Sequence, residues 1–154
     1  MLRILTLLLL VTPLCVPAQT YTAGKIVFNH PGDFTQQQLE DVAAIHPGTK
    51  FNNESLAVDA QRLADTGFFD NVGVTCEGPL QSLTVNFDIT PIDHSRLLPV
   101  GFENFIWLTP SELTSAVQSA SPLFAGYLPE NPALEDSIAA ALTQARSSFF
   151  EAHY

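Results

Sequence analysis

Residues 25–92 switch between short runs of β-forming residues and segments whose apolar residues recur at helical spacing. The run Ile-Val-Phe at residues 26–28 predicts a strand that ends in a turn. From Thr35 the apolar spacing becomes helical, and the pair Thr35 and Gln38 has the composition of an N-terminal capping box. The Pro-Gly dipeptide at residues 47–48 is expected to end this helix.

A second predicted helix begins at Asn53 and ends at Gly67, which we expect to be a left-handed C-terminal cap. Residues 72–76 and 83–89 then alternate between apolar and polar side chains, as in two strands that each bury one face. Phe68 and Phe69 are expected to close one end of the core. The order predicts an α+β fold, β-α-α-β-β, with two helices on one face of a three-stranded sheet.

Part of this pattern recurs later in the chain. Four residues of the first unit have counterparts at one offset of 74 positions: Phe28, Phe34, Thr35 and Leu39 correspond to Phe102, Leu108, Thr109 and Leu113. The Phe-Phe-acid motif at residues 68–70 is echoed at residues 149–151. We therefore expect an incomplete second copy, β-α-α, at residues 98–154, joined to the first unit (25–92) by a linker at 93–97.

The N-terminus has the layout of a secretory signal. Arg3 precedes an apolar run, and the small residues Val16 and Ala18 suit cleavage after Ala18. The signal is expected at residues 1–18, followed by a linker at 19–24. A membrane anchor is the weaker interpretation because a spanning helix needs about 20 apolar residues. A lipid anchor on Cys15 is also weaker because Leu14 stands where a small residue is required.

The charge of the chain excludes one class of function. The formal net charge is −10, with 16 acidic and 6 Lys and Arg residues. Such a surface repels nucleic acid and anionic lipid headgroups, and it favours basic or polar partners. No mature segment is long and apolar enough to span a membrane, so none is expected to do so.

The sequence offers weak candidates for catalysis or metal binding. Asp93, His94 and Ser95 are the residue types of a catalytic triad, but adjacent residues cannot face one another, so we interpret them as a solvated linker. Asp88 with Asp93 and His94 is a loosely spaced metal-ligand set. The remaining histidines are scattered. We therefore predict no catalytic, cofactor-binding or metal residues, no cofactor and no enzymatic activity.

Two further features have both a structural and a functional interpretation. Cys76 alternates in phase with Val72 and Val74, which favours a buried, inert thiol over a nucleophile. Phe105 and Trp107 form an aromatic cluster beside the predicted cap at Thr109. A hydrophobic staple on the following helix is favoured over a binding site there.

The first unit resembles a polypeptide-transport-associated (POTRA) domain of outer-membrane protein assembly and two-partner secretion proteins. The second helix and the following turn carry the resemblance through these residues: Leu56, Asp59, Arg62, Leu63, Gly67, Phe68, Phe69, Asp70, Asn71 and Val72. The resemblance extends to the first strand and first helix through these residues: 26–28, Phe34, Thr35, Leu39 and the Pro-Gly pair at 47–48. The turn at residues 29–32 departs from the short Gly-Asn turn that is common in the family.

The resemblance implies a non-enzymatic periplasmic module that binds partner chains, partly by adding a strand to an exposed sheet edge. The expected partners are unfolded outer-membrane or secreted client chains and accessory envelope proteins. Self-association through the second unit is a further expectation. We also expect the chain to be a fragment that lacks the C-terminal β-barrel of the family. The alternatives are a secreted acidic ligand-binding or inhibitor domain of similar layout and, less favoured, an envelope hydrolase.

Overall fold

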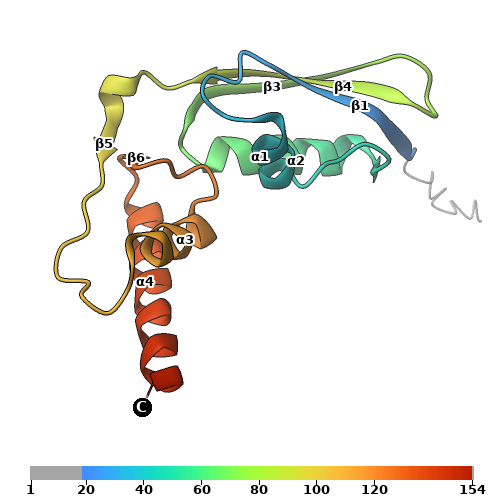
Figure 1. Cartoon of the computed structure of the whole chain (residues 1–154). Coiled ribbons are helices and arrows are strands. Elements are labelled where there is room, and N and C mark those ends of the chain that lie inside the picture. The colour runs from blue at the N-terminus through green and yellow to red at the C-terminus, as the bar shows by residue number, and fades with distance from the viewer. Residues whose placement is uncertain (1–18, 154) are drawn as a thin grey trace, which may run out of the picture.

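The computed structural model describes residues 19–153 and shows two packed units of α+β class (Figure 1). The predicted signal at residues 1–18 and the terminal Tyr154 lie outside the described residues. The first unit contains these elements: β1 (Tyr21–Asn29), α1 (Gln36–Ala43), β2 (Lys50–Phe51), α2 (Asn53–Asp65), β3 (Phe69–Glu77) and β4 (Leu83–Pro91). The α+β class predicted from the sequence is confirmed.

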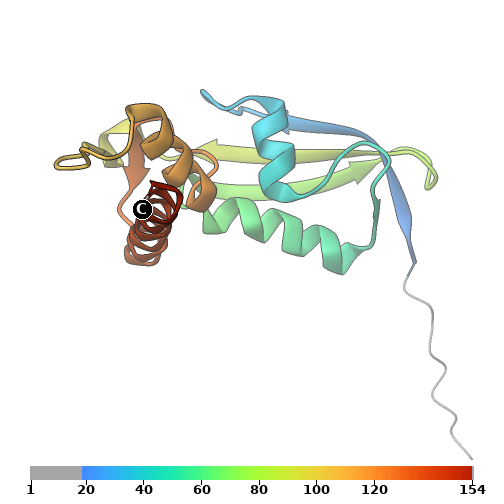
Figure 2. The same cartoon turned by 60° about the horizontal axis from the view of Figure 1, so that its bottom comes forward.

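The strands of the first unit form one sheet with the order β2-β1-β4-β3. β1 runs parallel to β4, whereas β2 pairs with β1 and β3 pairs with β4 in antiparallel fashion. Both helices lie on the same face of this sheet (Figures 1 and 2). The helices therefore cover one face, as the alternation of apolar and polar residues predicted.

Local signals in the sequence set the helix ends. Thr35 caps α1 in the expected capping box. The Thr35 hydroxyl oxygen accepts a hydrogen bond from the backbone N–H of Gln38, and the Gln38 side-chain oxygen accepts one from the backbone N–H of Thr35. α2 begins at Asn53 as predicted, and Asn52 accepts a 2.7 Å hydrogen bond from the backbone N–H of Ser55. Each cap satisfies backbone N–H groups that the first helical turn leaves without a partner.

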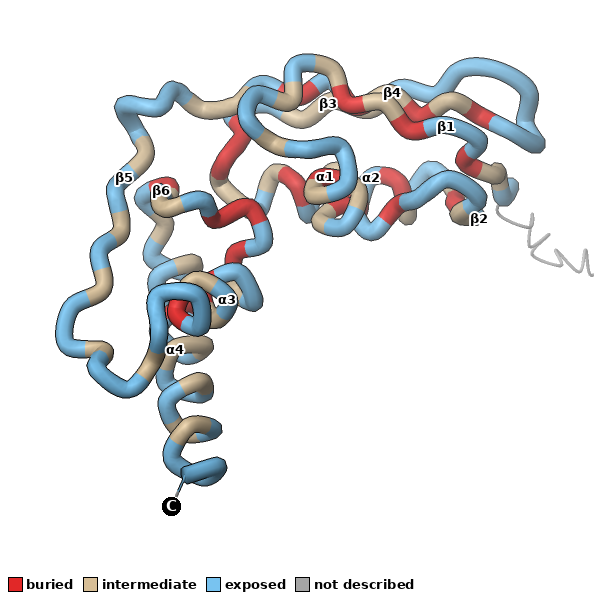
Figure 3. The backbone as a smooth tube through the Cα atoms, viewed as in Figure 1, coloured by how far each residue is buried: buried red, intermediate tan, exposed pale blue. Residues whose placement is uncertain are grey.

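The core of the first unit lies between the sheet and the two helices (Figure 3). The inward residues of β4 are buried as predicted: Leu83, Val85, Phe87 and Ile89. Phe28 stacks on Phe87 with ring centroids 4.9 Å apart. At the end of the core, Phe34 meets the edges of Phe68 and Phe69, which are both buried.

A buried carboxylate ties the two helices of the first unit together. Asp59 of α2 is 7% exposed and accepts a 2.8 Å hydrogen bond from the Arg62 guanidinium. The same Arg62 nitrogen donates to the backbone carbonyl of Ala43, near the C-terminal end of α1. Burial raises the pKa of Asp59, and the nearby Arg62 charge opposes part of that rise.

The second unit is smaller and contains four main elements after a 3₁₀ turn, η1 (His94–Arg96): β5 (Leu97–Pro99), α3 (Pro110–Ala120), β6 (Tyr127–Pro129) and α4 (Pro132–His153). β5 and β6 form a separate two-stranded antiparallel sheet. The buried residues of its own core are Val117, Phe124 and Ile138. Ile138 is the buried residue of the 22-residue α4.

The structure corrects the predicted layout in three places. β1 begins at Tyr21, so residues 21–24 belong to the sheet and not to a linker. β2 adds a fourth strand because the Pro-Gly turn directs residues 50–51 back along β1. In the second unit, β6 lies between the two helices, and Phe102 lies outside β5, so the β-α-α order is wrong there.

The two units share side-chain contacts and are not joined by a free linker. Leu123, from the loop after α3, is 1% exposed and belongs to the core of the first unit. Arg96 of η1 donates a 2.6 Å hydrogen bond to Asp70 of β3. Pro129 of β6 packs over Gly67 at the end of α2. These contacts hold α3 and α4 beside the helical face of the first unit (Figure 2).

Candidate functional site

The outer edge of β3 is a candidate binding edge. β3 is the last strand of the four-stranded sheet and pairs with β4 on one side only. The strand is nine residues long. An edge of this length offers a row of backbone donors and acceptors to an extended chain.

The opposite edge of the sheet is largely covered. β2 pairs with Tyr21 and Thr22 of β1, and Ala23 donates to Thr49 O and accepts from Gly48 N–H. Farther along, the side chain of Gln36 donates a 3.1 Å hydrogen bond to the backbone carbonyl of Ile26. The first turn of α1 therefore blocks the point at which a further strand would bond to β1.

The backbone groups that β3 directs outward can be identified from the ladder. Ile92, the residue directly after β4, donates its N–H to Phe68 O, on the side of β3. Backbone N–H and C=O groups alternate sides along a strand, so the even-numbered residues of β4 also direct theirs toward β3. Their partners in β3 are Asn71, Gly73, Thr75 and Glu77. The intervening residues, Val72, Val74 and Cys76, therefore present N–H and C=O groups at the free edge.

The prediction that Cys76 is buried is wrong. Cys76 lies opposite Val85, so its side chain is on the face that carries the core, as its phase with Val72 and Val74 predicted. The hairpin of β3 and β4 nevertheless extends beyond α2 (Figure 1), and the thiol is exposed. Neighbouring atoms exclude enough water to raise the pKa of the Cys76 thiol. The thiol therefore marks an uncovered part of the inner face, next to the free edge.

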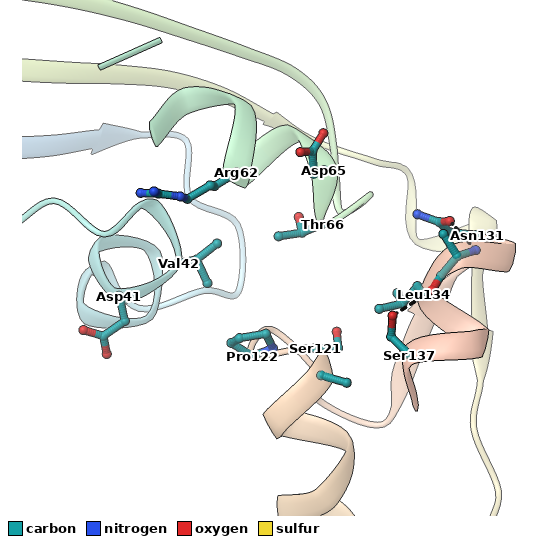
Figure 4. A pocket seen from close by; sticks show the side chains of 12 residues that line it. Asp41, Val42, Arg62, Asp65, Thr66, Ser121, Pro122, Asn131, Leu134 and Ser137 are labelled. Carbon is teal, nitrogen blue, oxygen red and sulfur yellow. Dashed lines mark hydrogen bonds between the residues drawn. The ribbon is translucent and has the colours of Figure 1, made fainter. Parts of the chain in front are cut away.

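A second candidate site is a groove between the two units (Figure 4). The groove has a volume of about 420 Å³ and is of the inter-unit kind in which ligand sites often occur. Its apolar part contains Val42, Pro122 and Leu134, and its polar lining includes the following residues: Asp41, Arg62, Asp65, Thr66, Ser121, Asn131 and Ser137. No sequence pattern predicted this groove, because its lining residues are up to 96 positions apart in the chain.

The structure does not assemble the catalytic candidates into a site. Asp93 caps η1 and accepts a 2.8 Å hydrogen bond from the backbone N–H of Ser95. Hydrogen bonding from the Ser95 side chain, and then from this backbone N–H, lowers the pKa of Asp93. His94 packs against the ring of Tyr127, with centroids 4.8 Å apart. Asp88 accepts a 2.7 Å hydrogen bond from Asn29. Among residues 19–153, no group of three His, Cys, Asp or Glu residues is placed to hold a metal ion.

The remaining histidines lie at separate places. His30 occupies a left-handed turn, and His46 lies 3.5 Å from Glu40. His153 stacks on Phe149 at the end of α4. Each of these contacts is local, so they do not form a common site.

The aromatic cluster before α3 makes a contact that the sequence did not predict. Trp107 packs against Phe150 near the end of α4, with ring centroids 5.6 Å apart, and Phe105 contacts Phe102. Ile106 between them is 85% exposed. The segment therefore closes onto α4 through its aromatic rings and leaves one aliphatic side chain in solvent.

Comparison with known proteins assigns the first unit to a family. Residues 21–91 match the sequence model of the POTRA family, described as a surface antigen variable number repeat. Residues 21–91, which hold the whole four-stranded sheet and both of its helices, are thus a POTRA domain. A comparison with curated proteins found no match.

Three solved structures to which this chain is similar are parts of Omp85 proteins. POTRA1-2 of the periplasmic domain of Omp85 from Anabaena is 18% identical, with a TM-score of 0.45, and the alignment covers 88% of this chain and 81% of that one. POTRA1-3 of the same protein is 16% identical with a TM-score of 0.45, covering 86% of this chain. The N-terminal domain of Omp85 from Thermosynechococcus elongatus is 16% identical with a TM-score of 0.47, also covering 86% of this chain. The chain spans about half the length of the latter two, 51% and 52%.

Proposed function

We propose that this protein is an exported, periplasmic interaction module that binds extended segments of partner chains by adding them as a strand to the free edge of β3. The partners are unfolded outer-membrane or secreted chains, or accessory envelope proteins. The POTRA domain at residues 21–91 supports the interaction role, and the similar Omp85 domains are described as periplasmic. Among residues 19–153, no helix has the length and apolarity to cross a membrane.

The observation that carries the proposal is the contrast between the two sheet edges. β1 is blocked by β2 and by the hydrogen bond from Gln36 to Ile26 O, whereas no strand within residues 19–153 pairs with the outer side of β3. Val72, Val74 and Cys76 direct their backbone groups to this edge. A partner strand would satisfy these groups, and its inward side chains would cover the exposed inner face around Cys76.

Hydrogen exchange with a defined peptide tests the proposal. The probe is a nine-residue peptide of alternating valine and threonine, flanked by lysines to suit the acidic surface. Binding should slow exchange of the amides of Val72, Val74 and Cys76 and leave the amide of Phe28 on β1 unchanged. A control peptide N-methylated along its pairing edge should give no protection. Equal protection by both peptides, or protection confined to β1, would contradict the proposal.

A proline substitution gives a matched pair of variants. Val74→Pro removes an N–H that points away from the sheet, a position where an edge strand tolerates proline. Losing one or two backbone hydrogen bonds should weaken peptide binding about five- to tenfold. Val74→Ala truncates the side chain but keeps the N–H, so it should bind nearly as well as the original chain. If Val74→Pro folds and binds unchanged, the β3 edge is not the binding edge.

A further inference from the structure

The second unit repeats the first four elements of the first unit in the same order. β5, α3, β6 and α4 follow one another as β1, α1, β2 and α2 do. β6 pairs with β5 in antiparallel fashion, as β2 pairs with β1. α1 and α3 both begin at a threonine capping box, and the two threonines, Thr35 and Thr109, are related by the offset of 74 positions. The two units therefore share one layout up to their second helix.

The strand beside β1 has no counterpart in the sheet of the second unit within residues 19–153. In the first unit, β4 runs parallel to β1 on the side away from β2. β5 pairs with β6 alone, so its other side borders no strand of the described chain. This side of β5 lies at the outer margin of the second unit (Figure 1). We call it the free side of β5, and it corresponds to the side of β1 on which β4 lies.

The backbone of the two units also points in matching directions. Gln36 donates to Ile26 O, so Ile26 directs its backbone away from β4. The residue 74 positions later, Val100, donates its N–H to Gly126 O and so directs its backbone toward the side of β6. Backbone groups alternate sides along a strand, and continued alternation directs the N–H and C=O of Gly101 to the free side of β5. Neither of these two groups has a hydrogen-bond partner within residues 19–153, and a β-carbon added to Gly101 would meet no atom within 4 Å.

Apolar side chains of the second unit are covered less completely than those of the first. Val100 and Phe102 are partly buried, whereas the residues to which they correspond, Ile26 and Phe28, are 1% and 8% exposed. β4 contributes to this burial, because the ring of Phe28 stacks on Phe87. One face of α4 carries an apolar row in which Ile138 is the buried residue: Leu134, Ile138, Leu142, Ala145 and Phe149. A strand on the free side of β5 would add the apolar cover that β4 gives the first unit.

We propose that the free side of β5 binds an extended segment of a partner polypeptide as a parallel strand, in the position that β4 holds beside β1. The segment alternates large apolar and polar residues, as β4 does. Its backbone bonds to the N–H and C=O of Gly101 and to the carbonyl of Pro99, a residue without an N–H that suits an edge strand. Its apolar side chains pack against Phe102 and the apolar row of α4.

A partner chain suits this position better than a second copy of this protein. Within residues 19–153, the strands with the required alternation are β3 and β4, and these two strands pair with each other in the first sheet. A second copy could donate either strand only by disrupting its own sheet. The site is independent of the proposed β3 edge, because β5 and β3 belong to different sheets. Either edge can therefore bind a strand without the other.

Hydrogen exchange with a peptide that copies residues 83–90 of β4 tests the site on the intact protein. The peptide carries a lysine at each end to suit the acidic surface. Binding should slow exchange of the amides of Gly101 and Glu103 about tenfold or more, because both amides enter the new ladder. A control peptide of the same composition, with its four apolar residues grouped together, should give no protection there. Protection confined to the β3 edge would overturn this proposal and leave the proposed function standing.

Two variants at Gly101 test the backbone contact. Gly101→Pro removes the N–H on the free side of β5 and should weaken binding of the β4 peptide about five- to tenfold. Gly101→Ala keeps this N–H and should bind the peptide as the original chain does. Unchanged binding by a folded Gly101→Pro variant would show that the peptide does not pair with this side of β5.

A paramagnetic label on the peptide tests the strand direction without any substitution in the protein. β4 runs parallel to β1, so a label at the N-terminus of the peptide should broaden the amide NMR signal of Leu98 more than that of Glu103. A label at the C-terminus should reverse this order. The opposite result for both labels would rule out a parallel strand. Protection of Gly101 that rises with protein concentration in the absence of peptide would make a second copy the occupant and overturn the proposal.

Discussion

Gly67 and Pro129 lie in contact where the two units meet. A β-carbon on Gly67 would come within 3.1 Å of Pro129 Cγ, closer than most such contacts. Gly67 also has a φ of +76°, in the left-handed region that a β-carbon disfavours. The predicted role of Gly67 as a left-handed residue after α2 is confirmed. Its contact with Pro129 is a second constraint that favours glycine at this position.

Gly67→Ala should lower the free energy of unfolding by about 1–2 kcal/mol because it adds both backbone strain and a close contact. Urea denaturation followed by circular dichroism measures the change. Gly101→Ala is the matched control, since Gly101 has no left-handed φ and an open surrounding, and it should change stability by less than about 0.5 kcal/mol. In the double variant with Pro129→Ala, part of the loss should be recovered. Equal stability of the Gly67→Ala and Gly101→Ala variants would contradict the assignment.

Arg62→Met should destabilise the protein by about 1–3 kcal/mol at neutral pH, since it leaves the buried Asp59 carboxylate without its cation. The loss should be smaller near pH 4. The pKa of Asp59 is raised in the folded state, so folding favours its protonated form. The contribution of Asp59 to stability therefore falls as the pH rises from its pKa in the unfolded chain through its pKa in the folded protein. Without Arg62, this loss of stability with rising pH should be larger.

Arg96→Met provides the control for that experiment. Arg96 pairs with Asp70 at 2.6 Å, but both side chains are largely exposed, so its loss should cost less than about 1 kcal/mol. Denaturation curves of both variants at pH 7 and pH 4 provide the comparison. A pH-independent loss for Arg62→Met would show that Asp59 is not the group responsible.

Cys76 should react with a water-soluble thiol reagent in the folded protein. Since its pKa is raised, the folded thiol has less thiolate near neutral pH than an unfolded one and should react more slowly. The two rates should converge as the pH rises above the folded pKa. The measurement requires a chain with Cys15→Ser, so that Cys76 is the sole thiol. Labelling that occurs only in denaturant would show that the thiol is buried after all.

Backbone amides of residues 97–153 should exchange faster with solvent than those of residues 21–92. Within residues 19–153, the first core contains sixteen buried residues, whereas the second contains Val117, Phe124 and Ile138. A small core resists local opening less, so exchange through such openings is faster. Hydrogen exchange followed by mass spectrometry, peptide by peptide, tests this. Equally slow exchange in both regions would mean that the contacts of Leu123 and Pro129 make the units open together.

Several features of the fold follow from local sequence signals alone. The caps at Thr35 and Thr109, the start of α2 and the left-handed Gly67 depend on residues only a few positions apart, so the sequence predicts them. The inward face of β4 also follows from simple alternation. The POTRA resemblance rests on the same local residues, and the family match at residues 21–91 confirms it.

Tertiary structure decided what covers each surface, and local sequence patterns did not predict this. The alternation of apolar and polar residues placed Cys76 on the correct face of the sheet. Whether the Cys76 thiol is buried depends on how far α2 extends beneath the hairpin, and alternation along one strand does not determine this. The choice between the two sheet edges depends on Gln36 reaching Ile26 O across ten residues. The groove arises only where Leu123 packs into the first core and brings Ser121 near Thr66. Local residues determine the elements, whereas the open edge and the groove depend on contacts between distant parts of the chain.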